Sequence, residues 1–297
     1  MRALLRHARP GPWDAFVVGD LEHPELPPGL CQDVHTVFHL AGKAHAVHEW
    51  GDADDAHRRI NLAGTRKILD LAGQAQVQGF VLFSSVKAQG EGGEAPLSEA
   101  QEPAPITPYG VAKLQAEAAV LAAETIGHRT IVRPSMVYGP GGKGNLTRMI
   151  QSVDRGLFPP WPPLSNRRSM VHVADVARAA LLAARHPAAH GQVFTLTDGQ
   201  AYATRQIYLW IRNALGKPPP RWHVPLSMLT ALARIGDGIG RVRRRRFAFD
   251  SEALDKLAGS SLYEAKRIRE LLGFVPDYDL EGSMDAIVRS VRDMGRS

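Results

Sequence analysis

Three residues of this chain, Ser85, Tyr109 and Lys113, have types and spacing that suit acid–base chemistry. Tyr109 and Lys113 stand four positions apart in a stretch of helical character, so their side chains share one face. A phenol with an ordinary pKa of about 10 is a poor base at neutral pH, and a nearby ammonium lowers that value. Such a pair also arises by chance in many helices, and alone it fits a surface lysine beside a half-buried tyrosine equally well.

The elements around these residues favour the functional interpretation. Ser85 follows the apolar run Phe80–Phe83, which predicts a strand, and the carboxyl edge of an open parallel sheet is where ligands bind. Near-continuous apolar runs predict strands buried on both faces at Arg2–Leu5, Ala15–Val18, Thr36–Leu40, Phe80–Phe83, Thr130–Val132 and Val193–Leu196. Longer stretches predict helices at about Asp54–Ala75, Tyr109–Glu124, Val173–Arg185 and Arg205–Leu215. This alternation is typical of a doubly wound α/β fold with a parallel sheet.

The composition of the chain changes after about residue 140, where Pro-rich loops separate the later helices. We therefore expect a dinucleotide-binding domain formed by residues 1–143 together with about 171–200. A smaller substrate-binding lobe would draw on residues 144–170 and about 201–297.

Charge and cysteine content narrow the class of protein. The 297 residues contain 36 Lys and Arg against 30 Asp and Glu, a net charge of +6. Five of the cations cluster at Arg241 and Arg243–Arg246, and without them the balance is 31 against 30, so the basic character is local and argues poorly for a nucleic-acid partner. The single cysteine, Cys31, excludes an internal disulfide framework and a multi-cysteine metal site. With no apolar run of about 18 residues, we expect a cytoplasmic protein without a membrane span.

An ordered series of short motifs resembles a known family. They are His39-Leu40-Ala41-Gly42, Asn61-x-x-Gly64-Thr65, Ser84-Ser85, Tyr109-x-x-x-Lys113, Arg133-Pro134, Val137-Tyr138-Gly139-Pro140, Arg168-x-x-Val171-His172-Val173-x-Asp175 and Leu272-Gly273-Phe274-x-Pro276. The series is similar to that of the extended short-chain dehydrogenases/reductases, in the NAD-dependent epimerase/dehydratase group. Within the group, Gly144-Asn145 and Asn166-Arg167-Arg168-Ser169 resemble nucleotide-sugar 4-epimerases and 4-ketoreductases of O-antigen or capsule synthesis.

This resemblance implies roles for particular residues. Tyr109 would be the general acid/base, Lys113 would lower its pKa and hold the nicotinamide ribose, and Ser85 would bond the reacting sugar oxygen. Ala41, Asn61 and Pro134 would line the NAD(P) cofactor, while Asn145 and Arg168 would bind the nucleotide-diphosphate sugar. The resemblance also implies a homodimer. The 4,6-dehydratases of the group carry a Thr-Asp-Glu run where this chain has Ser85-Val86-Lys87, so elimination of water is disfavoured.

The chain departs from the family at its amino terminus. Family members begin with a strand and a Gly-rich turn that receives the cofactor pyrophosphate at a helix N-terminus, whereas this chain starts at what resembles the second strand. We therefore expect roughly 25–35 further residues upstream, one strand with part of a crossover. In that frame the first strand would lie between Arg2–Leu5 and Thr36–Leu40, and its loss would separate the first two strands from the rest of the sheet.

The cofactor's adenine end is indicated by the strand ends that follow. Arg6 stands where NAD-preferring relatives carry an acid, so it slightly favours NADP; a solvated strand end is the alternative. Asp20 and Leu21 would lie beside the adenine. A literal G-x-G-x-x-G at Gly139, Gly141 and Gly144 sits mid-chain and is interpreted as a substrate-side loop.

Two other clusters have structural as well as functional interpretations. The histidines form a group in which His45-x-x-His48 has metal-ligand spacing, but no third ligand is evident and structural roles are favoured: His35, His39, His45, His48 and His57. The arginine cluster follows a helix-like stretch at Leu226–Ile239 and could bind a membrane surface or an anionic partner, but a solvated face or a phosphate-facing patch is favoured. The rival to the enzyme hypothesis is a catalytically silent family member, or a fragment, without firm cofactor binding.

Overall fold

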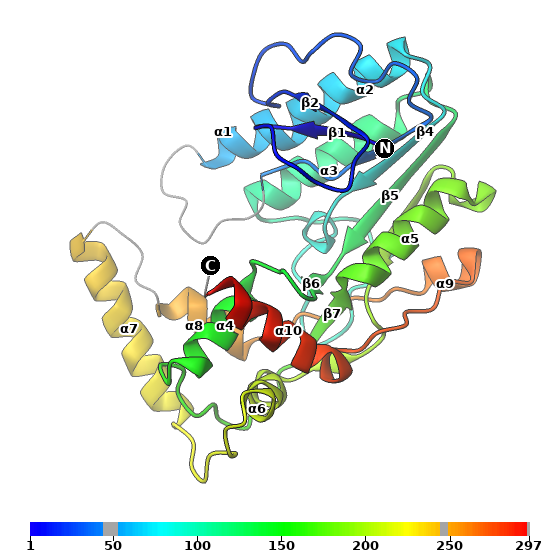
Figure 1. Ribbon diagram of the computed structural model, residues 1–297. Helices are drawn as coiled ribbons and strands as arrows, with labels where there is room; N and C mark the ends of the chain where they lie inside the picture. Colours follow the sequence, from blue (N-terminus) through cyan, green and yellow to red (C-terminus); the bar gives the residue numbers. More distant parts are fainter. Residues whose placement is uncertain (44–52, 244–248, 296–297) are drawn as a thin grey trace.

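The computed structural model describes residues 1–43, 53–243 and 249–295. Its main sheet has four parallel strands in the order β3-β4-β5-β8 (Figure 1). These strands are Thr36–His39, Gly79–Phe83, His128–Pro134 and Gln192–Leu196. The doubly wound α/β fold expected from the alternating pattern is therefore confirmed.

Helices cover both faces of this sheet because successive strand residues point to opposite sides. On β4, Phe80 and Leu82 pack with helices α2 (Gly64–Gln74) and α3 (Pro108–Leu121). Val81, between them, packs with α5 (Val173–Arg185) and α9 (Arg267–Leu272) on the other face. Strand β4 is consequently buried on both sides, which explains its continuous apolar run.

The first two strands form a separate sheet. β1 (Arg2–Leu5) and β2 (Ala15–Val18) pair in parallel with each other, and within the described residues no ladder joins them to β3. Strands β1 and β2 are thus separate from the main sheet, as expected from the sequence. Phe16, Val18 and Phe38 of these strands are exposed, which is unusual for large apolar side chains of a parallel sheet.

The later part of the chain builds a third sheet with its own apolar cluster. β6 (Met136–Tyr138) pairs in parallel with β7 (Arg168–His172), and β7 pairs antiparallel with β9 (Ala201–Tyr202). The cluster beside it joins residues from several helices, namely α4 (Asn145–Asp154), α6 (Thr204–Ala214), α7 (Leu226–Arg243), α8 (Ser251–Ala258) and α10 (Leu280–Met294). Strand β7, which spans the expected boundary at about residue 171, belongs to this small sheet, whereas α5 packs on the main sheet and β8 is one of its strands.

The long helix expected at about Asp54–Ala75 is divided in the structure. α1 (Ala53–His57) leads into a π-helical segment, η1 (Arg58–Ala63), and α2 continues from it. A π-turn is not visible in apolar spacing, and such turns frequently occur at functional sites. The remaining short segments are two 3₁₀ helices, η2 (Val86–Ala88) and η3 (Pro187–Ala189).

Candidate active site

Ser85 and Tyr109 are brought together at the carboxyl end of β4. Ser85 lies two residues beyond the strand and caps η2, accepting a 3.3 Å hydrogen bond from the Lys87 amide. Tyr109 is the second residue of α3, whose start is set by Thr107 as N-cap and Pro108 at the first position. A hydrogen bond joins the Ser85 and Tyr109 side chains.

A glycine allows these two elements to meet. A Cβ at Gly110 would lie 2.4 Å from the Lys87 carbonyl oxygen, so only glycine fits between the start of α3 and η2. This close approach places the tyrosine of α3 beside the serine of η2.

Lys113 follows one turn later on α3 and is buried. Its Nζ donates a 2.9 Å hydrogen bond to the Phe83 carbonyl at the end of β4. Burial lowers the pKa of Lys113 to about 8, and the Glu117 carboxylate opposes that shift. The lysine therefore lies at the sheet edge with a pKa near neutrality.

The pKa of Tyr109 differs from the expectation that Lys113 lowers it. Burial raises the pKa of Tyr109 above its usual value, and the hydrogen bond from Ser85 acts in the opposite direction. Because the ammonium of Lys113 is directed to the Phe83 carbonyl, Ser85 is the group that counteracts burial here. Tyr109 is protonated at neutral pH and can donate a proton.

Asn61 organises the loop after β3. Its Oδ1 accepts a 2.7 Å hydrogen bond from the Lys43 amide and its Nδ2 donates to the Lys43 carbonyl at 3.0 Å. A Cβ on the exposed Gly42 would lie 2.7 Å from Asn61 Oδ1 and 3.4 Å from Lys113 Nζ. The backbone at Gly42, the Asn61 amide and the Lys113 ammonium thus lie close together, with no room for a side chain at position 42.

His57 was singled out in the sequence only as one member of the histidine group. In the structure its buried ring meets the Tyr109 ring edge-on, with centroids 5.5 Å apart. Its Nδ1 lies 3.4 Å from Asn61 Nδ2. The i, i+4 spacing of His57 and Asn61 was the available signal, but without the fold nothing linked it to Tyr109.

A buried ion pair links helix α3 to strand β5. Arg133 of β5 contacts both carboxylate oxygens of Glu117, at 2.9 and 2.5 Å, and the two side chains are almost fully buried. Ser84 also donates to Glu117, and Arg133 donates to Gln89 just after η2. In the sequence Arg133 stands out only as part of the Arg133-Pro134 motif, and the four-residue spacing of Lys113 and Glu117 is the one local signal for its partner.

The residues predicted for the adenine end lie at the β1–β2 sheet. Arg6 is exposed directly after β1, and Asp20 follows β2, where its Oδ1 accepts a hydrogen bond from Glu22 N at 3.0 Å. Leu21 is a buried core residue instead, against which a Cβ at Gly64 would lie at 3.1 Å. Ala41 is exposed beside Gly42, and Pro134 ends β5, paired with Leu196.

The predicted substrate ligands belong to the small sheet and its helices. Asn145 is exposed at the first position of α4. Arg168 begins β7, and its Nη2 donates a 2.9 Å hydrogen bond to the Gly259 carbonyl. The glycine-rich stretch joins β6 to α4, with Gly139 and Gly141 at positive φ and the Gly141 amide donating to Ser290 of α10.

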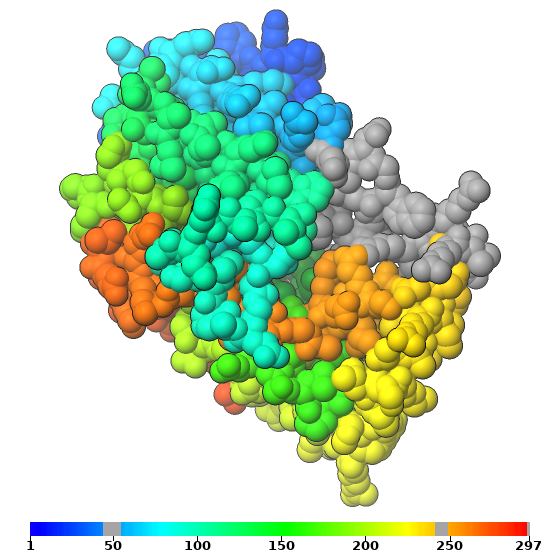
Figure 2. Space-filling view, turned by 180° about the vertical axis from the view of Figure 1, so that it is seen from behind, coloured from blue at the N-terminus to red at the C-terminus, as the bar shows by residue number. Residues whose placement is uncertain are grey.

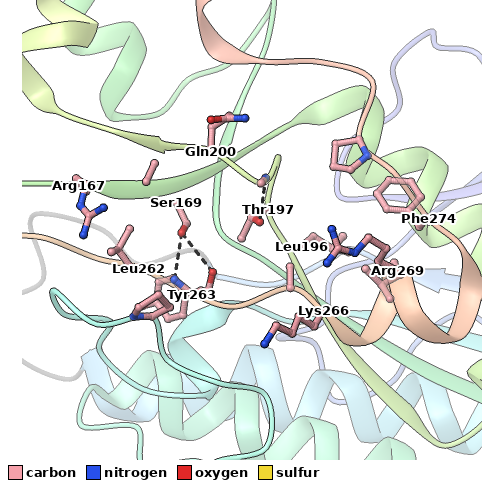
Figure 3. Close-up of a pocket in the computed structure, with 16 residues that line it drawn as sticks. Arg167, Ser169, Leu196, Thr197, Gln200, Leu262, Tyr263, Lys266, Arg269 and Phe274 are labelled. Carbon is pink, nitrogen blue, oxygen red and sulfur yellow. Dashed lines mark hydrogen bonds between the residues drawn. The ribbon is translucent and has the colours of Figure 1, made fainter.

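A separate pocket of about 340 Å³ lies beside β7 and β9 (Figure 3). It is lined by Arg167, Ser169, Thr197, Lys266 and Arg269, among other residues, and not by the serine, tyrosine or lysine described above. Alternation along an extended chain directs Arg168 away from the side on which its two neighbours line this pocket. The pocket is therefore distinct from the candidate catalytic residues.

The described part of the chain shows neither a metal-binding cluster nor a membrane-spanning helix. Residues 1–43, 53–243 and 249–295 contain no group of three or more His, Cys, Asp or Glu placed to hold a metal. His45 and His48 lie outside the described residues, and His35 and His39 hydrogen-bond to Thr36 and Thr65. In these same ranges, no helix has both the length and the apolar character to cross a membrane.

Comparisons with known proteins show the family to which the chain belongs. Residues 2–196 match the sequence model of the NAD dependent epimerase/dehydratase family. The chain is 29% identical to UDP-glucose 4-epimerase of Vibrio cholerae over 275 residues, 90% of this chain and 79% of that protein. It is 24% identical over 76% of its length to the N-acetyl-alpha-D-glucosaminyl-diphospho-ditrans,octacis-undecaprenol 4-epimerase of Escherichia coli O157:H7, covering 69% of that protein. The structure of MoeE5 in complex with UDP-glucose and NAD superposes with a TM-score of 0.75, 24% identity, and coverage of 99% and 90% of the two chains.

Proposed function

The chain belongs to the NAD dependent epimerase/dehydratase family, and on that premise we propose that it is a nucleotide-sugar 4-epimerase. The observation that carries the proposal is the hydrogen-bonded Ser85–Tyr109 pair with Lys113 one turn along α3, all at the carboxyl end of β4. Two of its relatives are named as 4-epimerases, of UDP-glucose and of a lipid-linked sugar.

Tyr109 and Ser85 handle the sugar oxygen. Oxidation of the carbon-4 hydroxyl needs Tyr109 as the phenolate, which takes the hydroxyl proton, and the phenol so formed returns that proton to the oxygen when the keto sugar is reduced. The Ser85 hydroxyl bonds the same oxygen and, because it also bonds the phenol, counteracts the effect of burial on the pKa of Tyr109. Arg168 and Asn145 bind the diphosphate of the substrate from the small sheet and α4.

NAD(P) would lie against the exposed backbone at Gly42, where the absence of a side chain leaves Asn61 and Lys113 close to the main chain. The bound nicotinamide would supply the hydride acceptor and donor. Lys113 and Tyr109 would hold its ribose, while Asn61 keeps the Gly42–Lys43 backbone in place. Arg6, the residue that favours NADP over NAD, is exposed directly after β1. The affinity of the chain should therefore be measured for both cofactors.

Elimination of water is disfavoured by the residues after Ser85. A dehydratase needs an acid at this point, and the chain has the buried Val86 and then Lys87, which pairs with Glu91. The site therefore offers proton transfer at one oxygen without an acid for a leaving hydroxyl.

The test is Tyr109→Phe, assayed for interconversion of UDP-glucose and UDP-galactose with NAD. We expect turnover to fall on the order of a hundred- to ten-thousand-fold, because the phenyl ring cannot transfer the proton. Calorimetry should show unchanged affinity for UDP-glucose. Tyr278→Phe is the matched control, since this exposed ring stacks on His172 away from Ser85, and it should retain full turnover.

Three results would count against the proposal. An unimpaired Phe variant removes Tyr109 from the mechanism. Consumption of reduced cofactor with a 4-keto sugar, without interconversion, identifies a 4-ketoreductase. Failure of the unaltered chain to bind either NAD or NADP supports the silent family member.

A further inference from the structure

Helix α7 (Leu226–Arg243) has one face packed in the core. Leu229, Ala233, Gly236 and Gly240 are buried, a spacing of four, three and four residues that lies on one side of the helix. Leu229 and Ala233 join the cluster that also contains Leu254 of α8. Through this face α7 packs against the rest of the molecule.

A second apolar stripe on α7 is exposed. Met228, Leu232 and Ile235 have the same four-and-three spacing, and they are 56%, 45% and 58% exposed. Trp222, four residues before the helix, is 63% exposed. Large apolar side chains scattered singly on a surface need no explanation, but a row of them along one helix marks an interaction site.

The charges around this stripe are positive. Arg221 and Arg234 are exposed, and the sequence after α7 continues the arginine run. The single acid of the helix, Asp237, accepts hydrogen bonds from the amide and hydroxyl of Ser251 at 3.0 and 2.6 Å. That carboxylate is thus engaged by α8.

We propose that α7 docks on an anionic lipid surface. The helix would lie in the interface with Met228, Leu232 and Ile235 among the acyl chains and with Arg221 and Arg234 against the headgroup phosphates. An exposed apolar stripe, a tryptophan and flanking arginines are the features of helices that bind membrane surfaces. The position of α7 along one outer border of the molecule leaves it accessible (Figures 1 and 2).

Charge distinguishes this occupant from a second copy of the chain. Two copies meeting through the stripe would bring arginines of both subunits together, and the one carboxylate of α7 is already engaged by Ser251. An anionic surface instead complements those charges, because basic residues near the membrane are attracted to its headgroups.

Vesicle flotation tests the proposal with the purified chain. We expect it to float with phosphatidylglycerol-containing vesicles, to remain unbound with pure phosphatidylcholine, and to be released by high salt. Leu232→Glu combined with Ile235→Glu should lower partitioning by roughly tenfold or more, since each side chain would leave the apolar phase. Leu157→Glu, at a 73% exposed position after α4, is the matched control and should float as the unaltered chain does.

A second measurement follows the tryptophan itself. Addition of anionic vesicles should shift the fluorescence to shorter wavelength, and Trp222→Phe should remove that shift while the far-ultraviolet circular dichroism stays unchanged. Absence of flotation at low salt, equal binding to neutral vesicles, or equal loss in the Leu157 control would overturn the proposal. A dimer in light scattering that becomes a monomer in the Leu232/Ile235 variant would overturn it in favour of a second copy.

Discussion

His39 and Lys113 are buried titratable groups whose environments suppress their charged forms. Burial, with a contribution from the Lys113 ammonium, lowers the pKa of His39 to about 4, and its Nε2 lies 3.0 Å from Thr65 Oγ1. Lys113 with a pKa of about 8 is still protonated at pH 7. Both pKa shifts have the same main cause, because burial excludes water where β3, α2 and α3 meet.

The depressed pKa of His39 predicts acid destabilisation. Between pH 6.5 and about 4 the unfolded chain binds a proton that the folded chain does not, so the free energy of unfolding falls as pH is lowered through this window. The full effect of one such group is about 3 kcal/mol. Denaturant unfolding of His39→Gln across this range should show a shallower pH dependence than the unaltered chain.

His35→Gln is the control for that measurement, because His35 is exposed just before the same strand. It should leave the pH dependence intact. Parallel curves for the unaltered chain and the His39 variant would show that His39 isn't the group responsible.

At the scale of elements, α3 is the part that carries the chemistry. Tyr109, Lys113 and Glu117 follow one another at intervals of four residues and therefore lie on one face of the helix. Along this face Tyr109 contacts Ser85, Lys113 contacts the end of β4, and Glu117 contacts Arg133. Replacing only one member of the buried Glu117–Arg133 pair would leave an uncompensated charge. The position of α3 relative to η2 is set by Gly110.

Gly110→Ala should misplace Tyr109 relative to Ser85. The added Cβ would stand 2.4 Å from a backbone oxygen, so the start of α3 must move. We expect turnover to fall on the order of a hundredfold, as reactive groups lose their alignment. Gly238→Ala on α7, where nothing lies within 4 Å of the new Cβ, is the control and should leave turnover unchanged. Full activity in the Gly110 variant would mean that the close approach is not needed.

At the scale of the whole molecule, the division of the strands into three sheets determines which parts are most stable. Strands β3, β4, β5 and β8 are linked by ladders and covered by helices on both faces, whereas β1 and β2 pair only with each other among the described residues. A two-stranded sheet has little stability of its own. Leu4 and Val17 contact the core only as partly buried residues.

Amide hydrogen exchange should therefore distinguish the sheets. We expect the β1–β2 amides to be protected at least about a hundredfold less than those of β4 and β5, because a local opening suffices to expose them. Exchange followed by mass spectrometry on peptides covering residues 2–18 and 79–83 makes the comparison. Equal protection would show that β1 and β2 unfold only with the main sheet.

Local sequence patterns were sufficient to predict the fold class. Apolar runs and helical stretches reflect burial periodicity, which each segment carries by itself, and Tyr109 and Lys113 share a face through helix geometry alone. The position of Ser85 just after a strand likewise follows from chain order. The roles of these residues remain proposals.

Only the tertiary structure decided how distant segments meet. The His57 ring beside Tyr109, the Glu117–Arg133 pair and the approach of Gly42 to Asn61 each join residues far apart in the chain. The separation of β1 and β2 from β3 is likewise a property of the folded chain. The pKa of Tyr109 belongs to the same group, because it depends on which neighbours exclude water and which donate hydrogen bonds. Such contacts depend on packing between elements, and a residue's own neighbours in sequence carry no record of them.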